Sequence, residues 1–359
     1  MSVNKKFFEA LLDLADERGL SLEEVIDSFD KALRVAFKNT KGHQSARIET
    51  DVEAKDFGVY EQFLVVEDEG FDLHADPQYK QLKLAEAKQM KKSAKVGDIL
   101  EQKVDLTEFS PKAILNLKQV FKQNLTKYEK TNLYKYFKEK EKEMIVARVI
   151  DQDERFYRLD LGKEVTTLLP KKETLENDDF VDGEAIKVYI ALVEEQTRGP
   201  KILVTRLEKS LVVRLFEDLI PEVKEGIVEV MGVSRNPGDR SKIGVRSNDP
   251  NVDAIGSCVG ADGTRIKEIV RSLSGEKIDL FLWSDNEKDL IANSLQPAEV
   301  VNVIEIDPKE KTAIAIVEDD KLSLAIGKNG QNVKLAVQAI NWKIDIKSVS
   351  MANAEGLTY

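Results

Sequence analysis

Two tetrapeptides, Gly260-Ala261-Asp262-Gly263 and Gly327-Lys328-Asn329-Gly330, decide how the second half of this sequence is expected to fold. Each lies between two stretches whose apolar residues recur at helical spacing, and each is followed by the tripeptide Lys-Ile-Asp, at 277–279 and at 343–345. From the first glycine to the shared isoleucine the separation is 18 residues in one copy and 17 in the other. Self-similarity of this kind predicts two related units in tandem.

The two copies also share the elements that precede their tetrapeptides. A short helical segment comes first, and a hairpin pattern follows that turns at Asn236-Pro237-Gly238 in one copy and at Asp307-Pro308 in the other. We therefore predict two units of order α-β-β-α-α-β, over residues 207–286 and 287–350, with a short tail at 351–359.

A GxxG loop between two helices is the feature by which a KH domain clamps the backbone of about four nucleotides. Glycines lack a Cβ atom, so a sugar-phosphate chain can approach the main chain closely. The next helix offers unpaired N–H groups and the positive end of its dipole, and nearby basic side chains add charge. We predict two RNA-binding KH domains with contacts from Gly260, Ala261, Asp262, Gly263, Arg265, Lys267, Gly327, Lys328, Asn329, Gly330 and Lys334. The alternative is a tight helix–turn–helix link that serves only packing.

Residues 139–206 have the pattern of a small β-barrel. Five short runs rich in β-branched residues are separated by Gly, Asp, Pro and Asn clusters, at 144–150, 155–161, 166–169, 185–193 and 201–205. Five antiparallel strands in about 65 residues are typical of an OB fold. Phe156 or Tyr157, if exposed, would be a platform for stacking a base. The alternative is that one of these rings lies in the core and the other on the surface.

Residues 1–138 are predicted to form a helix-rich α/β domain. A first helix is expected to stop at Gly19, and Ser21 with Glu24 begins a second as a capping box. Strand patterns follow at 46–52, 58–66 and 99–106, with a lysine-rich helical or turn segment at 79–95. A long helix is expected from Pro111 to about residue 142. The whole chain is thus expected to be an α+β multidomain protein.

The charge is unevenly distributed along these segments. The 359 residues carry a net charge of −11, whereas a protein that binds nucleic acid mainly by long-range attraction is usually basic. Residues 1–79 carry 9 basic and 18 acidic side chains, and residues 80–138 carry 14 and 6. Segments of opposite sign suggest different partners, with unequal solvation of ordinary domains as the alternative. Any RNA contact in the repeats must depend on local geometry more than on net charge.

Several functional classes are not favoured by the sequence. No apolar run reaches the roughly 18–20 residues of a membrane span, and the first residues lack the order of a signal peptide, so we expect a cytoplasmic protein without membrane contact. The single cysteine, Cys258, is expected to be a core thiol, and His43 and His74 leave little for a metal site. No Walker or G-x-G-x-x-G motif is present. We expect no catalytic residue, metal or cofactor.

The motifs resemble the NusA family of bacterial transcription termination/antitermination factors. The matching stretches are 214–217, 235–238, 247–253, 256–263, 275–279 with Trp283-Ser284, and 325–333. The resemblance covers essentially the whole chain and is strongest from about 210 to 346, whereas the first 140 residues match by element order more than by motif.

This resemblance implies a separate function for each segment of the chain. It implies an amino-terminal domain (1–138) that docks on RNA polymerase near the RNA exit channel, an S1-type OB barrel (139–206), and two KH domains that bind the nascent single-stranded transcript. The protein would then be a non-catalytic factor that modulates pausing and termination, with other transcription factors as further partners. Lys112, Lys118 and Lys122 of the long helix, or the acidic first segment, are expected to contact the polymerase; a solvated helix face is the alternative for those lysines. No heptad run suggests a coiled coil, and we expect a monomer.

The sequence departs from the family pattern in two places. Asp262 stands where a basic residue is common, which makes the first KH unit the weaker clamp. The sequence ends soon after the second unit, so we expect neither acidic carboxy-terminal repeats nor autoinhibition by them. Two other classes use the same modules: RNA-processing enzymes, for which residues 1–138 are too short to supply a catalytic core, and translation or ribosome-assembly factors.

Overall fold

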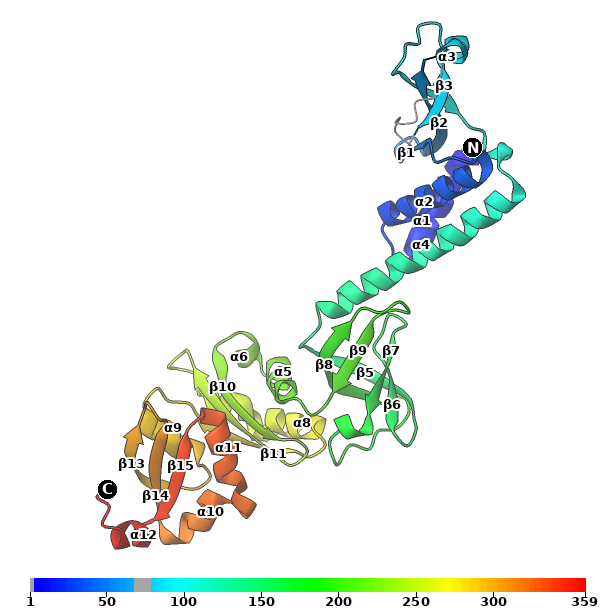
Figure 1. Ribbon diagram of the computed structural model, residues 1–359. Helices are drawn as coiled ribbons and strands as arrows, with labels where there is room; N and C mark the ends of the chain where they lie inside the picture. The colour runs from blue at the N-terminus through cyan, green and yellow to red at the C-terminus, as the bar shows by residue number, and fades with distance from the viewer. Residues whose placement is uncertain (1–2, 68–78) are drawn as a thin grey trace. The chain divides into compact units, whose positions relative to one another are not determined.

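The computed structural model describes residues 3–67 and 79–359, and the chain divides into two compact units (Figure 1). The first unit comprises residues 1–135 and 197–200, and the second comprises residues 136–196 and 201–359. His74, considered above as a metal ligand, lies outside the described residues.

The first unit is a mixed helical and β-sheet domain, as predicted. Its elements are α1 (Val3–Arg18), α2 (Leu22–Lys41), β1 (Ala46–Asp51), β2 (Asp56–Val66), β3 (Lys80–Lys83), α3 (Leu84–Met90), β4 (Ile99–Lys103) and most of α4 (Pro111–Lys138). The capping box at the start of α2 is confirmed: the Glu24 N–H donates to Ser21 Oγ (3.2 Å), and the Ser21 N–H donates to Glu24 Oε2 (2.9 Å). β2 pairs with all three other strands, antiparallel to β1 and β4 and parallel to β3.

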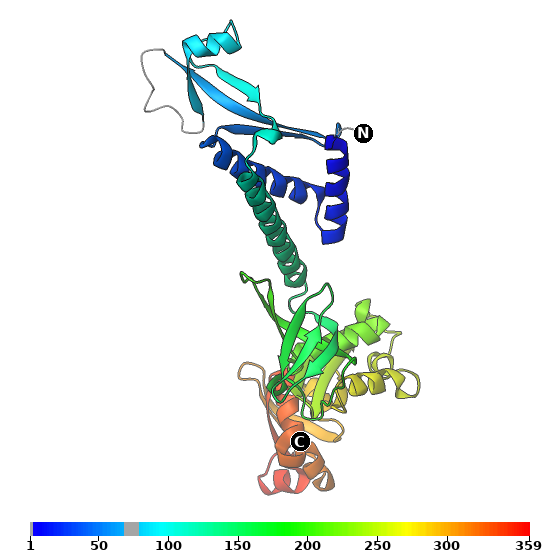
Figure 2. The ribbon, with the colours of Figure 1, turned by 90° about the vertical axis from the view of Figure 1, so that its right-hand side faces the viewer.

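Aromatic side chains hold the helices of this unit together. α1 and α2, drawn in blue in Figure 2, meet through Phe7 and Phe29, whose ring centroids are 4.7 Å apart. Phe121 of α4 approaches Phe29 edge-on at 5.9 Å. The lysine-rich segment 79–95 was predicted as helix or turn, but its first part is the strand β3, which pairs with the edge of β2.

The second unit begins with a barrel of five strands. They are β5 (Met144–Gln152), β6 (Phe156–Asp160), β7 (Thr166–Pro170), β8 (Ala185–Glu194) and β9 (Lys201–Thr205), in the order β7-β6-β5-β8-β9 with antiparallel neighbours. The Thr167 hydroxyl of β7 donates to the Ile202 carbonyl of β9 (2.6 Å). The barrel is therefore nearly closed, consistent with the predicted OB fold.

The two predicted repeats have the same fold. The first contains α5 (Lys209–Leu219), α6 (Pro221–Lys224), β10 (Val228–Asn236), β11 (Arg240–Ser247), α7 (Ala254–Val259), α8 (Thr264–Ser272) and β12 (Lys277–Leu282). The second contains α9 (Glu287–Ser294), β13 (Val300–Asp307), β14 (Thr312–Val317), α10 (Leu322–Ile326), α11 (Gln331–Ile340), β15 (Lys343–Ser348) and α12 (Val349–Ala354). In each, the middle strand pairs antiparallel with the first and parallel with the last. The register aligns 277–279 with 240–242, and 343–345 with 312–314.

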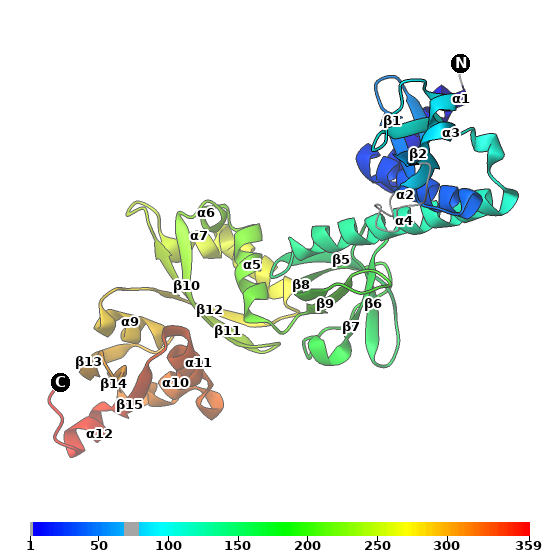
Figure 3. The same cartoon turned by 45° about the horizontal axis from the view of Figure 1, so that its top comes forward.

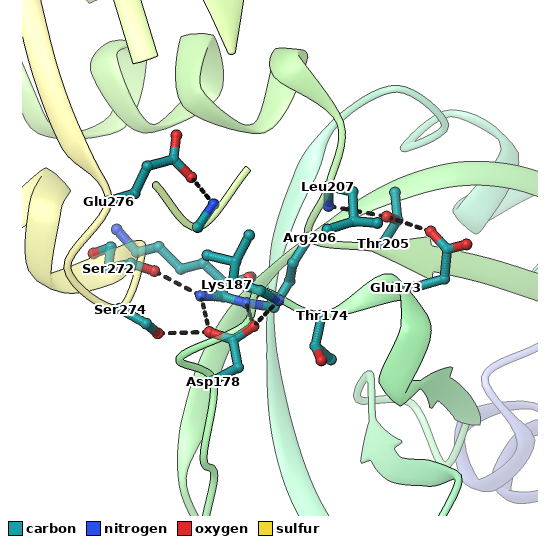
Figure 4. A network of polar contacts seen from close by, with 12 residues as sticks. Glu173, Thr174, Asp178, Lys187, Thr205, Arg206, Leu207, Ser272, Ser274 and Glu276 are labelled. Carbon is teal, nitrogen blue, oxygen red and sulfur yellow. Dashed lines mark hydrogen bonds and ion pairs between the residues drawn. The ribbon is translucent and has the colours of Figure 1, made fainter. Parts of the chain in front are cut away.

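A buried ion pair joins the barrel to the first repeat (Figure 4). Arg206, which follows β9, donates to both carboxylate oxygens of Asp178, at 2.7 and 3.0 Å, and both side chains are almost fully buried. The same guanidinium donates to the Ser272 carbonyl at the end of α8, and the Ser274 hydroxyl donates to Asp178. Barrel and repeat thus share one polar network.

The second repeat packs on the sheet of the first. α11 lies alongside β10 and β11 (Figure 3). A Cβ atom at Gly232 would lie only 2.4 Å from the Ala339 carbonyl oxygen, so the close approach of α11 requires glycine there. Ser234 Oγ donates to Gln338 Oε1 (2.8 Å), and the buried Lys242 ammonium donates to the Gln296 carbonyl (2.7 Å). The barrel and both repeats form one compact unit.

Candidate nucleic-acid interface

The two GxxG loops have the same backbone conformation. In the first, Gly260, Asp262 and Gly263 have φ values of 73°, 51° and 71°. In the second, Gly327, Asn329 and Gly330 have φ values of 77°, 54° and 72°. Left-handed conformations favour glycine, and asparagine or aspartate tolerates them better than other residues, which matches the residues present. The backbone part of the predicted site is therefore the same in both repeats.

The second loop faces an open groove of about 500 Å³. Residues of both repeats line it: Arg235, Asn236, Asp239, Lys328, Asn329, Gln331, Lys334, Leu335 and Gln338. Lys328, Asn329 and Lys334 are exposed. Within the part of the chain that the structure describes, neither lysine has a carboxylate within ion-pair distance. Both ammonium groups are therefore available to an anionic ligand such as a phosphodiester.

The arginine in this groove has a structural role. Arg235 forms a buried ion pair with Glu276, with Nη2 at 2.9 Å from Oε2, and also donates to the Glu208 carbonyl. Glu276 in turn accepts from the Ser241 hydroxyl (2.6 Å) and from the Gly238 N–H (2.9 Å). This pair fixes the β10–β11 turn against the start of β12, and it leaves the two lysines as the free cations of the groove.

The residue five positions after the first glycine differs between the two loops. Counting from the first glycine of each loop, Arg265 and Asn332 occupy the same position. Asn332 is buried, and its Nδ2 donates to the Leu295 and Ala325 carbonyls, both at 2.9 Å. A Cβ atom on Gly327 would lie 2.7 Å from the Asn332 backbone nitrogen, so only glycine fits there. Asn332 belongs to no predicted contact, although a polar residue on the apolar side of a helix is a signal that marks it.

Arg265, predicted to contact RNA, is half-buried, and its guanidinium already bonds within the first KH domain. Its Nη1 donates to Glu222 Oε2 of α6 (2.7 Å) and to the Ser257 carbonyl of α7 (2.6 Å). Lys267, also predicted, donates to the carbonyl of Asp262 within its own loop (2.8 Å). Ala261 and Asp262 are exposed, so a carboxylate stands where the second loop has an amide. The first loop therefore has the backbone of the clamp but fewer free cations beside it, because Arg265 is paired with Glu222 and, among the residues that the structure describes, only Lys267 of the two lacks a carboxylate partner.

The barrel carries one of the two predicted aromatic rings on its surface. Tyr157 is only 3% exposed, and its ring packs edge-on against Phe180 at 5.3 Å, so its predicted role in base stacking is wrong. Phe156 is half-buried, with the Arg155 guanidinium 5.8 Å from its ring centroid. Arg158 and Leu168, which pair across β6 and β7, are both exposed. The second and third strands form the ligand-binding face of an OB fold, so this surface is the barrel's candidate contact.

The lysines predicted to contact the polymerase lie on an exposed part of α4. Lys112, Lys118 and Lys122 are all exposed. Leu115 lies between them and is 66% exposed, which is unusual for a leucine within a helix of a folded domain. Lysines around an exposed leucine form a surface that is both basic and apolar.

The remaining chemistry of the described residues is structural. Cys258 is fully buried in the core of the first repeat, as predicted, and burial raises the pKa of its thiol to about 12. His43 Nε2 lies 2.9 Å from the buried Glu61 carboxylate. Among residues 3–67 and 79–359, no group of three or more His, Cys, Asp or Glu side chains could hold a metal ion. No helix in the same ranges is long and apolar enough to cross a bilayer.

Two α-β-β-α-α-β units with GxxG loops between their paired helices define a protein with tandem KH domains, the class of RNA-binding domain that the loops predicted. Three family models match in order along the chain: the NusA N-terminal domain over residues 6–131, the NusA-like first KH domain over 206–283, and the NusA-like second KH domain over 287–354. The chain belongs to the NusA family of transcription termination/antitermination proteins.

Relatives of nearly equal length support this assignment. Each is a transcription termination/antitermination protein NusA. The protein from Halalkalibacterium halodurans is 40% identical over 99% of this chain and 91% of its own length. The protein from Bacillus subtilis is 39% identical (99% and 94%), and the one from Thermus thermophilus is 36% identical (98% and 92%). The solution structure of the N-terminal domain of NusA from B. subtilis is 29% identical over 35% of this chain and 98% of that chain, with a TM-score of 0.26.

Proposed function

We propose that this protein is a non-catalytic, cytoplasmic regulator that connects RNA polymerase to the nascent transcript. Residues 1–138 bind the polymerase, and the barrel (139–206) and KH domains (207–286 and 287–350) bind the emerging single strand. By holding that strand, the protein changes pausing, hairpin formation and termination. It acts as a monomer.

The second GxxG loop with its groove carries the proposal. The loop backbone allows close approach of a sugar-phosphate chain, α11 begins directly after it, and Lys328 and Lys334 are unpaired and exposed. The groove is open and mostly polar. The first loop and the Phe156 face of the barrel are secondary contacts, because fewer free cations lie beside them.

RNA binding by the groove is tested with a charge reversal. Replacing Lys328→Glu and Lys334→Glu removes two phosphate contacts and adds two negative charges, so affinity for a single-stranded RNA should fall at least about 50-fold at moderate salt. The measurement is fluorescence anisotropy with a labelled oligonucleotide. Lys309→Glu with Lys343→Glu is the matched control, because these two exposed lysines of the same repeat lie outside the groove. Unchanged affinity in the double variant, with an intact fold, would refute the groove as the RNA site.

Polymerase binding by α4 is tested by co-purification. The triple variant Lys112→Glu, Lys118→Glu and Lys122→Glu should lose polymerase subunits from a tagged preparation. Lys127→Glu with Lys135→Glu, exposed lysines further along the same helix, should retain them. Recovery of ribosomal subunits in place of polymerase would identify a translation or ribosome-assembly factor instead.

A further inference from the structure

The groove beside the second loop contains a carboxylate that a phosphate clamp does not need. Asp239 lies at the end of the β10–β11 turn of the first KH domain, yet it lines the groove of the second. A carboxylate next to a phosphodiester is repelled by it, so Asp239 is badly placed for backbone binding. Its position therefore favours contact with another part of the nucleotide.

The turn that carries Asp239 is held from several sides. The Asp239 N–H donates to the Asn236 carbonyl (3.1 Å), and the Lys277 N–H donates to the Asp239 carbonyl (2.9 Å). The buried Glu276 accepts from the Gly238 N–H (2.9 Å), one residue before Asp239. The carboxylate thus stands on a fixed backbone, which is what a selective contact requires.

The carboxylate also organises the amides next to it. Asn236 Nδ2 donates to Asp239 Oδ2 (3.0 Å), and Gln331 Nε2, from the residue directly after the second GxxG, donates to the same oxygen. Both amides therefore direct their N–H groups to Asp239, and Asp239 Oδ1 is left to accept from a ligand. The turn therefore presents one free carboxylate oxygen to the groove beside the clamp.

We propose that the turn of the first KH domain reads a base held by the second KH domain, and that Asp239 selects a base with an exocyclic amino group over uracil. This inference rests on the proposed RNA binding in the groove. Adenine, cytosine and guanine each project an amino group that can donate to a carboxylate. Uracil projects carbonyl oxygens in the corresponding places, and these are repelled. Asp239 is thus a specificity-determining residue for the RNA that the groove holds.

Cytosine and uracil provide the sharpest test, because they have the same shape and differ only along one edge. C4 carries an amino group in cytosine and a carbonyl in uracil, and N3 accepts a hydrogen bond in cytosine and donates one in uracil. The measurement is the affinity of the full chain for oligocytidylate and oligouridylate of about eight nucleotides, twice the span of one KH clamp. The wild type should prefer cytidylate about fivefold or more. Asp239→Asn keeps the shape, but its amide can turn its N–H toward a uracil carbonyl. The ratio of the two affinities should therefore fall toward one, while affinity for both RNAs rises because a negative charge is lost.

Two variants separate the possible outcomes. Asp262→Asn makes the same change in the first loop, outside the groove, and should leave the ratio unchanged. Lys328→Ala should weaken both RNAs equally. If Lys328→Ala weakens binding but Asp239→Asn leaves the ratio as in the wild type, the base-reading role is refuted and the groove remains the RNA site. If Lys328→Ala also has no effect, the RNA site itself is misplaced and the inference fails with it.

Discussion

The two KH domains share a backbone but differ in what surrounds it. Their GxxG loops have matching φ values, and their strands pair in the same register. Around the second loop the charges are unpaired and face an open groove, whereas around the first the cations bond to protein atoms. The comparison shows that a GxxG motif specifies a loop conformation, and that neighbouring side chains determine whether the loop can bind phosphate.

The difference extends into the cores of the two domains. At the start of the last strand, the first domain has the buried Glu276 paired with Arg235, whereas the corresponding residue of the second domain is the buried Trp342. The buried Lys242 of the middle strand β11 corresponds to Ile314 of β14. Lys242 pairs with Asp279 and Ile314 pairs with Asp345, and these are the two aspartates of the Lys-Ile-Asp tripeptides. The first domain therefore uses buried charge where the second uses apolar packing.

The largest effect is expected from breaking the buried pair. Glu276→Ala leaves the Arg235 guanidinium buried without a counter-charge, and it removes the acceptor for Ser241 and Gly238. Loss of one partner of such a pair costs about 3–5 kcal/mol of unfolding free energy, measurable by urea denaturation. Glu276→Gln, which keeps the volume and one acceptor, should cost less. A loss below about 1 kcal/mol in the alanine variant would contradict the burial described here.

Lys242 should make stability depend on pH in the alkaline range. Burial lowers the pKa of its ammonium from 10.5 to about 8. Between these values the unfolded chain binds a proton that the folded chain does not, so the free energy of unfolding contributed by this residue rises with pH across that window. The rise amounts to about 3 kcal/mol. The variant Lys242→Ile carries the residue found at the corresponding position of the second domain, so its free energy of unfolding should not show this rise. The measurement is urea unfolding at several pH values. If the free energies of unfolding of the wild type and the variant change with pH in parallel, the lowered pKa of Lys242 is contradicted.

Exchanging the loop residues should move RNA affinity from one domain to the other. Lys328→Ala with Asn329→Asp gives the second loop the residues of the first, and the left-handed backbone already accepts aspartate at Asp262. RNA affinity should fall about 20-fold, because one phosphate contact is lost and a negative charge is added. Circular dichroism should show an unchanged fold. Equal binding by the two proteins would mean that the first loop already supplies most of the affinity.

The reverse exchange should have the smallest effect. Ala261→Lys with Asp262→Asn adds a cation to the first loop and removes its carboxylate. Affinity should rise about threefold to fivefold, and the slope of log affinity against log salt should steepen by about one. No change in that slope would show that RNA does not reach the first loop.

Much of this architecture could be predicted because its signals are local. The Ser21 capping box, the five strand runs and the two GxxG loops each depend on residues close in sequence. The strand β3 could not be predicted from the sequence, because residues 80–83 become a strand only by pairing with β2. The interior position of Tyr157 was readable from alternation, since Tyr157 and Leu159 share a face opposite to Arg158.

The candidate site was predictable only in its backbone. Arg265 could not be assigned, since its partner Glu222 lies 43 residues earlier, on a helix that the second domain lacks. The groove combines a turn of one domain with a loop of the other, and no spacing within either repeat indicates that they meet. Asp239 therefore stood outside every motif.

The ion pair between Arg206 and Asp178 limits where the chain can be cut to express its domains separately. A cut between codons 206 and 207 follows the boundary suggested by the repeat pattern, but it runs through the middle of a shared network. A fragment that starts at 207 would expose the end of α8, and the barrel fragment would keep a guanidinium and a carboxylate whose covering surface is gone. The second KH domain also packs on the sheet of the first and accepts from the buried Lys242, so the smallest piece that should be prepared and studied in isolation is the barrel together with both KH domains.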